Sequence, residues 1–249
     1  MNTWITEKGT RIKLVFYGPS NVYLVSRDGH SFLVDAATLV SLGGITAGVK
    51  KSGEPAPSML VLTHTHFDHA GSAAALRARY GLKIMAHGHD VDFVASGISP
   101  FPAGTTLGTK AFMAVMKLPG ELVTRYPGAS VDIPVSEPIS LEDHGYDALV
   151  MPTPGHSEGC LSIVVDNEVA LVGDTLYALA TKSIVSPFVD DKDKLFESLC
   201  WLYDSGCQVF LPGHGPAISR ERLKEQIDDL VRRRKLKAQR KKREQYEDS

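Results

Sequence analysis

The sequence predicts an α/β fold in which two packed β-sheets are covered on their outer faces by helices. Strand-like apolar runs occur in two groups along the chain, and helical patterns lie within and between these groups. The chain has 249 residues, of which 43% are hydrophobic, so it can bury a substantial core. We therefore expect one large layered domain rather than several small ones.

The first group of strands contains a hairpin signature, R-D-G-H at 27–30, which is typical of a turn between two antiparallel strands. The strands expected in this group are 11–16, 22–26, 31–34, 59–63 and 83–86. The helices expected among them lie within 36–50, at about 69–80 and near 90–96. The second group contains strands at 148–151, 160–165, 169–172 and 209–211, with a helix around 192–204.

Residues 220–249 are expected to form a C-terminal basic helix that packs on the domain formed by residues 1–219. This segment contains twelve Lys or Arg and seven Asp or Glu. Its first turns should pack on the domain, because apolar residues recur at helical spacing: Leu223, Ile227, Leu230 and Val231. The run 232–243 can bind nucleic acid or another anionic surface, but a solvated helix end is the commoner explanation of such a run.

Composition indicates a cytoplasmic protein without a membrane partner. The sequence has no long apolar span, and residues 1–8 do not have the pattern of a signal peptide. Three cysteines are an odd number and suit a reducing compartment. Cys160 opens an apolar run, so we interpret it as a buried strand residue rather than a metal ligand.

The segment from His64 to His69 reads H-T-H-F-D-H and directly follows the apolar run 59–63. Imidazoles and carboxylates need polar partners once they leave water, and a divalent cation satisfies all of them. His64 and His66 point the same way in an extended chain and can bind one ion, whereas Asp68 and His69 face a different point. The loop has no Cys, which favours a catalytic metal site over a structural one.

Three further apolar runs end on a candidate ligand. They place His156, Asp174 and His214 directly after a strand. A Gly before each of these residues lets the backbone turn tightly, so the side chain can project from the edge of a sheet. Each signal is weak alone, but with the dense motif they indicate one shared metal site.

These four segments resemble the metallo-β-lactamase superfamily: H-T-H-F-D-H at 64–69, P-G-H-S at 154–157, G-D-T at 173–175 and P-G-H-G at 212–215. The resemblance spans roughly residues 12–216 and implies the four-layer αββα sandwich of that family. It also implies two divalent metal ions, Zn²⁺ in the first place, with Fe or Mn as alternatives. The implied ligands are His64, His66 and His156 for the first ion, Asp68, His69 and His214 for the second, and Asp174 bridging the two.

Within the superfamily the chain looks most similar to the glyoxalase II-like group and the lactonases. This resemblance implies a hydrolase that cleaves an ester, thioester or lactone of a small-molecule acyl substrate by attack of a metal-bridging hydroxide. Asp68 would orient the hydroxide and receive its proton. Tyr177 looks like the tyrosine with which N-acyl homoserine lactone lactonases bind the substrate carbonyl, and simple packing against the sheet end is its alternative role.

Residues 97–130 interrupt the alternation of strands and helices. The stretch 97–104 resembles a loop, and 110–118 is apolar enough for a short buried helix. Because insertions near the sheet edge often wall the substrate pocket in this superfamily, Phe112, Met113 and Met116 are candidates to meet an apolar substrate. Packing of the same helix on the core of the domain is equally consistent with the sequence.

Other functional classes stay open at this point. The basic C-terminal helix is compatible with a metal-dependent ribonuclease or phosphodiesterase that uses it to bind RNA. Some relatives oxidise persulfides with a single iron, and others lose their metals and act as binding modules. The remaining histidines, His30, His87, His89 and His144, are not expected to bind metal. The oligomeric state is open, a dimer included.

Overall fold

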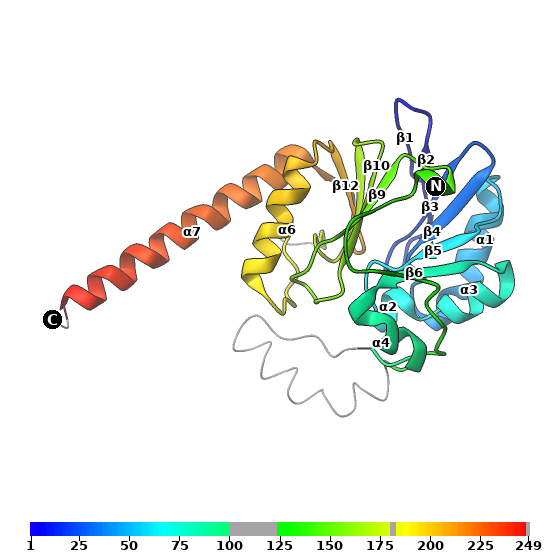
Figure 1. Cartoon of the computed structure of the whole chain (residues 1–249). Helices are drawn as coiled ribbons and strands as arrows, with labels where there is room; N and C mark the ends of the chain where they lie inside the picture. The colour runs from blue at the N-terminus through cyan, green and yellow to red at the C-terminus, as the bar shows by residue number, and fades with distance from the viewer. Residues whose placement is uncertain (100–123, 180–182, 248–249) are drawn as a thin grey trace.

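The computed structural model describes residues 1–99, 124–179 and 183–247, which form four layers (Figure 1). Two β-sheets pack face to face, and helices cover the outer face of each sheet. The αββα sandwich predicted from the sequence is therefore confirmed.

The first sheet has seven strands in chain order, and its last four strands run parallel to one another. These strands are β1 (Thr3–Ile5), β2 (Arg11–Phe16), β3 (Val22–Arg27), β4 (His30–Val34), β5 (Met59–Val61), β6 (Lys83–His87) and β7 (Ile133–Val135). The helices on or beside its outer face are α1 (Leu42–Ser52), α2 (Phe67–Ala70), α3 (Ala73–Tyr80) and α4 (Val91–Ser96).

The second sheet has six strands in the order β13-β12-β11-β10-β9-β8. They are β8 (Ile139–Ser140), β9 (Ala148–Pro152), β10 (Leu161–Val165), β11 (Val169–Gly173), β12 (Val209–Pro212) and β13 (Ile218–Ser219). Helix α6 (Lys192–Asp204) and the first turns of α7 (Arg220–Glu247) cover its outer face. Beyond α6, helix α7 projects away from the sandwich (Figure 1).

Successive residues of the central strands face different layers, which explains why these strands are apolar throughout. In β4, Phe32 and Val34 join the core between the two sheets, whereas Leu33 packs under the helices. The ring of Phe32 meets Tyr146 edge to face, with 4.7 Å between the ring centroids. Both faces of the central strands β3, β4, β10 and β11 are thus largely buried.

Several elements differ from the sequence prediction near the strand ends. Strand β5 ends at Val61 rather than at 63, because the Thr63 amide donates to the Asp35 carboxylate instead of a neighbouring strand. The helix expected within 36–50 starts only at Leu42, after positive φ angles at Asp35 (64°) and Ala37 (45°) and a short 3₁₀ turn, Leu39–Ser41. The helix expected at 69–80 is divided into α2 and α3. Strands β1, β7, β8 and β13, each of two or three residues, were not predicted.

The segment 97–130 lies only partly within the described residues. The backbone amides of Tyr126 and Ala129 donate to the carbonyls of Gly97 and Val94 at the end of α4. The residues expected to meet a substrate, Phe112, Met113 and Met116, lie outside the described part, so their role stays a prediction. In the parts of the chain that the structure describes, every helix is too short or too polar to cross a membrane.

Candidate metal centre

The histidine motif begins in the loop after the carboxyl end of β5 and continues into α2, which contains Asp68 and His69. Because β4, β5 and β6 are parallel, their carboxyl ends meet at the same edge of the first sheet. The ends of β9, β11 and β12 bring His156, Asp174 and His214 to this edge from the second sheet. The cluster therefore forms where the two sheets meet.

The first group of donor atoms belongs to His64, His66 and His156, all of which are buried. His66 Nδ1 lies 3.0 Å from His64 Nε2 and 3.1 Å from His156 Nε2. All three nitrogens lie within 4.8 Å of one another. Three imidazole nitrogens that converge on one point make a tripod of the kind that binds a divalent cation.

The second group consists of Asp68, His69 and His214. The Nε2 atoms of His69 and His214 are 3.2 Å apart, and Asp68 Oδ2 lies 3.4 Å from His214 Nε2. The Ser20 hydroxyl donates to the backbone carbonyl of Asp68 and so fixes this turn from the β2–β3 loop. This group has the composition of a second cation site beside the first.

Asp174 lies between the two groups. Its Oδ1 is 3.4 Å from His69 Nε2 and 3.5 Å from His214 Nε2, whereas its Oδ2 is 3.7 Å from His156 Nε2. Oδ1 is buried and has no hydrogen-bond partner. A buried carboxylate oxygen without a partner is costly, so its position fits a metal ligand.

Gly213 leaves the space that the cluster occupies. A Cβ atom at this position would lie 2.4 Å from His69 Cε1 and 2.7 Å from Asp174 Oδ1. Any other residue at 213 would therefore displace one of these side chains. The Gly before His214 thus has a packing role, whereas a positive φ is found at the glycines before the other two ligands, Gly155 (138°) and Gly173 (48°).

Protein acceptors orient three of the imidazoles from the side opposite the cluster. His69 Nδ1 donates to Asp35 Oδ2 at 2.8 Å, and His156 Nδ1 donates to the carbonyl of Phe188 at 2.7 Å. His64 Nδ1 lies 3.2 Å from the Thr63 hydroxyl. An acceptor on Nδ1 fixes the proton there and leaves the Nε2 lone pair of the ring for a cation.

The electrostatic environment favours the ligand forms of these groups. Burial lowers the pKa of His64 far below its usual value and the pKa of His66 to about 3, so both rings are neutral at pH 7. Burial opposes ionisation of Asp174, but His69 and His214 hold its pKa well below the usual range. Neutral imidazoles beside an ionised carboxylate are the protonation states that metal binding requires.

His69 behaves differently, because burial lowers its pKa while Asp35, Asp174 and Asp68 together raise it well above the usual value. Three carboxylates around one imidazole create a local excess of negative charge. A divalent cation at this place would neutralise that charge in the way that a proton on His69 does. The donor set and its charge therefore fit divalent metal ions.

Two carboxylates that support the cluster, Asp35 and Asp90, were not recognised in the sequence. Asp35 accepts from Thr63 as well as from His69, and Thr63 Oγ1 lies 2.9 Å from its Oδ2. Asp90 accepts from the hydroxyl of Thr65, which stands between the first two histidines of the motif. A single Asp after a strand has no sequence signature, although the left-handed backbone of Asp35 marks it in the structure.

Tyr177 lies next to the second group of donors. Its ring centroid is 5.0 Å from that of His214, and its amide donates to the carbonyl of Ile184 at 2.8 Å. Burial, with Asp174 and Asp68, raises the pKa of its phenol. The hydroxyl is therefore protonated at neutral pH, and its predicted role as a hydrogen-bond donor stays a prediction.

The remaining candidates lie outside the donor groups found among the described residues. Cys160 is buried, accepts from the Ser157 amide and has its pKa raised to about 12 by burial. His87 Nδ1 accepts from the backbone amide of His89. His87 thereby caps the short 3₁₀ turn Gly88–Asp90. His30 is the exposed first residue of β4, directly after the hairpin turn, and His144 is the last residue of the 3₁₀ turn Glu142–His144.

A helix-covered β-sandwich with buried His and Asp groups at one edge, together with the comparison with known proteins, places this protein in the class of metal-dependent hydrolases. The chain belongs to the metallo-beta-lactamase superfamily, whose family model matches residues 15–238. This confirms the resemblance seen in the sequence.

Individual relatives extend this result. The chain is 24% identical to the probable metallo-hydrolase YflN of Bacillus subtilis over 237 residues, which cover 86% of this chain and 87% of that protein. It is 33% identical to a hydroxyacylglutathione hydrolase of Maricaulis maris over 119 residues, 47% of this chain and 33% of that enzyme. The fold is similar to that of BJP-1, a subclass B3 metallo-beta-lactamase of Bradyrhizobium japonicum, with a TM-score of 0.61. The two sequences are 19% identical, and the match covers 93% of this chain and 91% of the BJP-1 chain.

Proposed function

We propose that this hydrolase holds two divalent cations, Zn²⁺ in the first place, and cleaves an ester, thioester or lactone of a small acyl substrate. The observation that supports it most is the position of Asp174, which turns one carboxylate oxygen toward each group of histidines. In this proposal the ligands of the first cation are His64, His66 and His156, those of the second are Asp68, His69 and His214, and Asp174 bridges them.

When bound, such ions lower the pKa of a coordinated water and withdraw electron density from a substrate carbonyl. Asp68 then acts as the proton acceptor. Its pKa is lowered, because the opposing effect of burial is outweighed by His69 and by the contact with His214, so Oδ2 is free of a proton at pH 7. Tyr177 keeps its proton and donates it in a hydrogen bond to the substrate carbonyl oxygen.

An acyl substrate is supported by the hydroxyacylglutathione hydrolase of Maricaulis maris, which is 33% identical over the matched region. The matched region is less than half of this chain, so we infer from it the class of bond that is cleaved but not the identity of the substrate. The Lys and Arg pattern with which glyoxalase II binds glutathione is not recognisable at the end of this sequence. We therefore expect a thioester, ester or lactone without a glutathione requirement.

A substrate panel with measured metal content tests the proposal. The Zn²⁺-loaded protein would be assayed on an acylglutathione, a simple acyl thioester, an acyl lactone, an aryl ester, a β-lactam, an aryl phosphodiester and single-stranded RNA. We expect turnover of the simple thioester, the lactone or the aryl ester, no dependence on the glutathione part of the acylglutathione, and about two zinc ions per chain. A single iron with persulfide oxidation, or turnover confined to the phosphodiester or the β-lactam, would contradict the proposal.

Helix α7 favours a second candidate, a ribonuclease. Nine of the twelve residues from 232 to 243 are Lys or Arg, and residues 232–239 are exposed on the part of α7 that projects from the domain. Such a helix suits the phosphate backbone of RNA. RNA binding that weakens with salt and disappears on deletion of residues 232–249, together with RNA cleavage, would support this candidate.

A further inference from the structure

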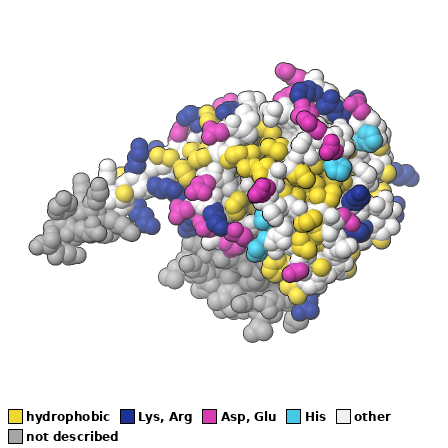
Figure 2. All heavy atoms as spheres, in the orientation of Figure 1, with side chains coloured by type: hydrophobic (Ala, Val, Ile, Leu, Met, Phe, Trp, Pro, Cys, Tyr) yellow, Lys and Arg dark blue, Asp and Glu magenta, His cyan; other side chains and the backbone are white. Residues whose placement is uncertain are grey.

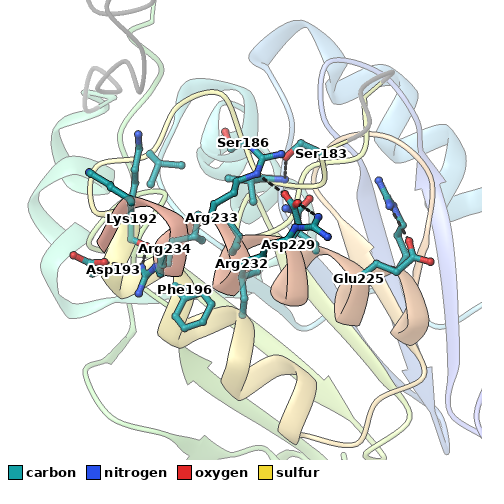
Figure 3. Close-up of a pocket in the computed structure, with 18 residues that line it drawn as sticks. Ser183, Ser186, Lys192, Asp193, Phe196, Glu225, Asp229, Arg232, Arg233 and Arg234 are labelled. Carbon is teal, nitrogen blue, oxygen red and sulfur yellow. Dashed lines mark hydrogen bonds and ion pairs between the residues drawn. The ribbon is translucent and has the colours of Figure 1, made fainter. Parts of the chain in front are cut away.

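A cleft lies between α6, α7 and the segment 183–189, and it has a volume of about 960 Å³ (Figure 3). It contains none of the seven candidate metal ligands. Its size is that of a cleft for a small organic molecule, for which volumes of roughly 300 to 1,000 Å³ are typical. The cleft is therefore a site to be explained separately from the metal centre.

The floor of the cleft is apolar. Val189, Leu195 and Leu199 are buried beneath it, and Phe196 and Leu230 contribute partly buried side chains. The apolar surface that faces the cleft is therefore supplied by the partly buried Phe196 of α6, Leu230 of α7 and Val185 of the segment 183–189. Such a floor suits a hydrocarbon chain rather than a polar ligand.

The rim of the cleft is basic. Six Lys or Arg side chains line the cleft but only three acidic ones, Asp193, Glu225 and Asp229. Asp229 is shared by two guanidinium groups, since Arg232 reaches its Oδ1 at 2.5 Å and Arg233 its Oδ2 at 2.6 Å. One carboxylate thus faces two cations, whose side chains are 70% and 74% exposed. Figure 2 shows dark blue side chains gathered where α7 leaves the domain.

Arg234 joins the rim to the floor. Its guanidinium lies over the ring of Phe196, 4.1 Å from the centroid, and donates to Asp193 Oδ1 at 2.6 Å. Figure 3 shows this pair at one end of the cleft and Asp229 with its two arginines near the other. Positive charge therefore borders the apolar floor over much of its length.

The wall of the cleft is fixed from behind by the metal centre. The Ile184 carbonyl accepts from Tyr177, and the Ile184 amide donates to Gln226 Oε1 of α7 at 3.1 Å. Further along, the Phe188 carbonyl accepts from His156. These hydrogen bonds connect both ends of the segment 183–189 to the sandwich and to α7, so this wall of the cleft has protein partners that do not depend on a ligand.

We infer that this cleft binds an anionic amphiphile, a small molecule with an apolar chain and a carboxylate or phosphate head group. The chain lies on the floor formed by α6 and α7, and the head group lies against Arg232 and Arg233. Because Asp229 neutralises only one of these two arginines, the head group supplies the second negative charge. The inference does not depend on the proposed acyl hydrolase activity.

Calorimetric titration of the full chain with dodecanoate and dodecyl phosphate, below their micelle concentrations, tests the site. We expect saturable binding of at least one of them at one molecule per chain, and binding of dodecyltrimethylammonium that is weaker by about tenfold or more. The comparison of the two anionic probes identifies the preferred head group. Equal affinity for the cationic probe, or no saturable binding, would overturn the inference.

Paired variants locate the binding. Arg232→Gln with Arg233→Gln should weaken binding by about tenfold, because both head-group contacts are lost. Lys224→Gln with Lys235→Gln removes the same charge from α7 outside the cleft and should change affinity by less than about twofold.

Val185→Asp, on the wall of the cleft, should also abolish binding while thermal unfolding shows a folded protein. Equal losses in the two double variants would mean attraction by α7 as a whole and would refute the site.

Discussion

Each of the two carboxylates assigned to metal binding has a distinct environment, and this difference decides what each can do. Asp174 is buried between the two groups of histidines, and its Oδ1 has no hydrogen-bond partner. Asp68 is the more accessible of the two, with its side chain 21% exposed, and it lies beside His214. These environments agree with the roles proposed above, in which Asp174 bridges two cations and Asp68 meets a water molecule and a substrate.

Asp68→Asn should lower kcat by about 10²- to 10⁴-fold, because an amide cannot accept the proton of the attacking water. Steady-state rates would be measured together with the metal content of the purified variant. The exposed Asp143→Asn is the matched control and should retain the full rate. Normal turnover with full metal content in the Asp68 variant would remove this residue from the role.

Tyr177→Phe should lower kcat by about 100-fold with a smaller change in KM, because the phenol hydrogen bond is made mainly as charge develops on the carbonyl oxygen. Tyr80→Phe, at the end of α3, serves as the control. An unchanged kcat for the Tyr177 variant would support the alternative that this ring only packs against His214.

Gly213→Ala should weaken Zn²⁺ binding by about tenfold or more, because the added methyl group would meet both His69 and Asp174. Gly43→Ala adds the same methyl group in α1, where nothing lies within 4 Å of it. Competition with a chromogenic chelator measures both affinities. Equal affinities in the two variants would show that the cluster can move aside at no cost.

At the scale of elements, strand ends determine the site. The parallel strands β4, β5 and β6 deliver Asp35 and the histidine motif to one edge, and β11 and β12 deliver Asp174 and His214 from the other sheet. The sequence predicts this much because apolar runs that end in a ligand are visible without coordinates. All seven residues expected at the metal centre lie in the three overlapping groups of donors.

Other parts of the site are not visible in the sequence for physical reasons. Asp35 binds Thr63 and His69 across the strand ends, and that partnership depends on a left-handed backbone that Asp adopts only in a specific context. The cleft between α6 and α7 depends on how far apart two helices lie. Periodicity identifies the apolar face of each helix but not the distance between them.

Helix α7 owes its place to a few apolar contacts in its first turns. Leu223 is fully buried in the cluster that includes Leu199 and Leu202 of α6, whereas Leu236 on the projecting part is 59% exposed. Leu223→Ala should lower the free energy of unfolding by about 2–5 kcal/mol. Leu236→Ala, the same change on the same helix, should cost less than about 0.5 kcal/mol.

Chemical denaturation of both leucine variants measures these differences directly. If both variants unfold at the denaturant concentration of the unchanged protein, the first turns of α7 do not contribute to the stability of the second sheet and its helices. If both are strongly destabilised, the projecting part of α7 must have a partner that covers Leu236.

At the scale of the whole molecule, the sandwich separates stability from chemistry. The core between the two sheets consists of buried apolar residues, whereas the buried His64, His66 and Asp174, whose pKa values are lowered, lie together at one edge. The net charge of −2 conceals a basic tail of +5 and a remainder of −7. The excess of basic side chains is found on α7 and around the cleft beside it. The acidic side chains of the candidate metal centre, in contrast, belong to the sandwich.

A crystal structure of the Zn²⁺-loaded protein, with anomalous data collected at the zinc edge, tests the central claim most directly. We predict two zinc peaks, one among His64, His66 and His156 and one among Asp68, His69 and His214. One oxygen of Asp174 should face each peak. A single peak, or zinc bound elsewhere while the cluster holds none, would contradict the two-cation account of this protein.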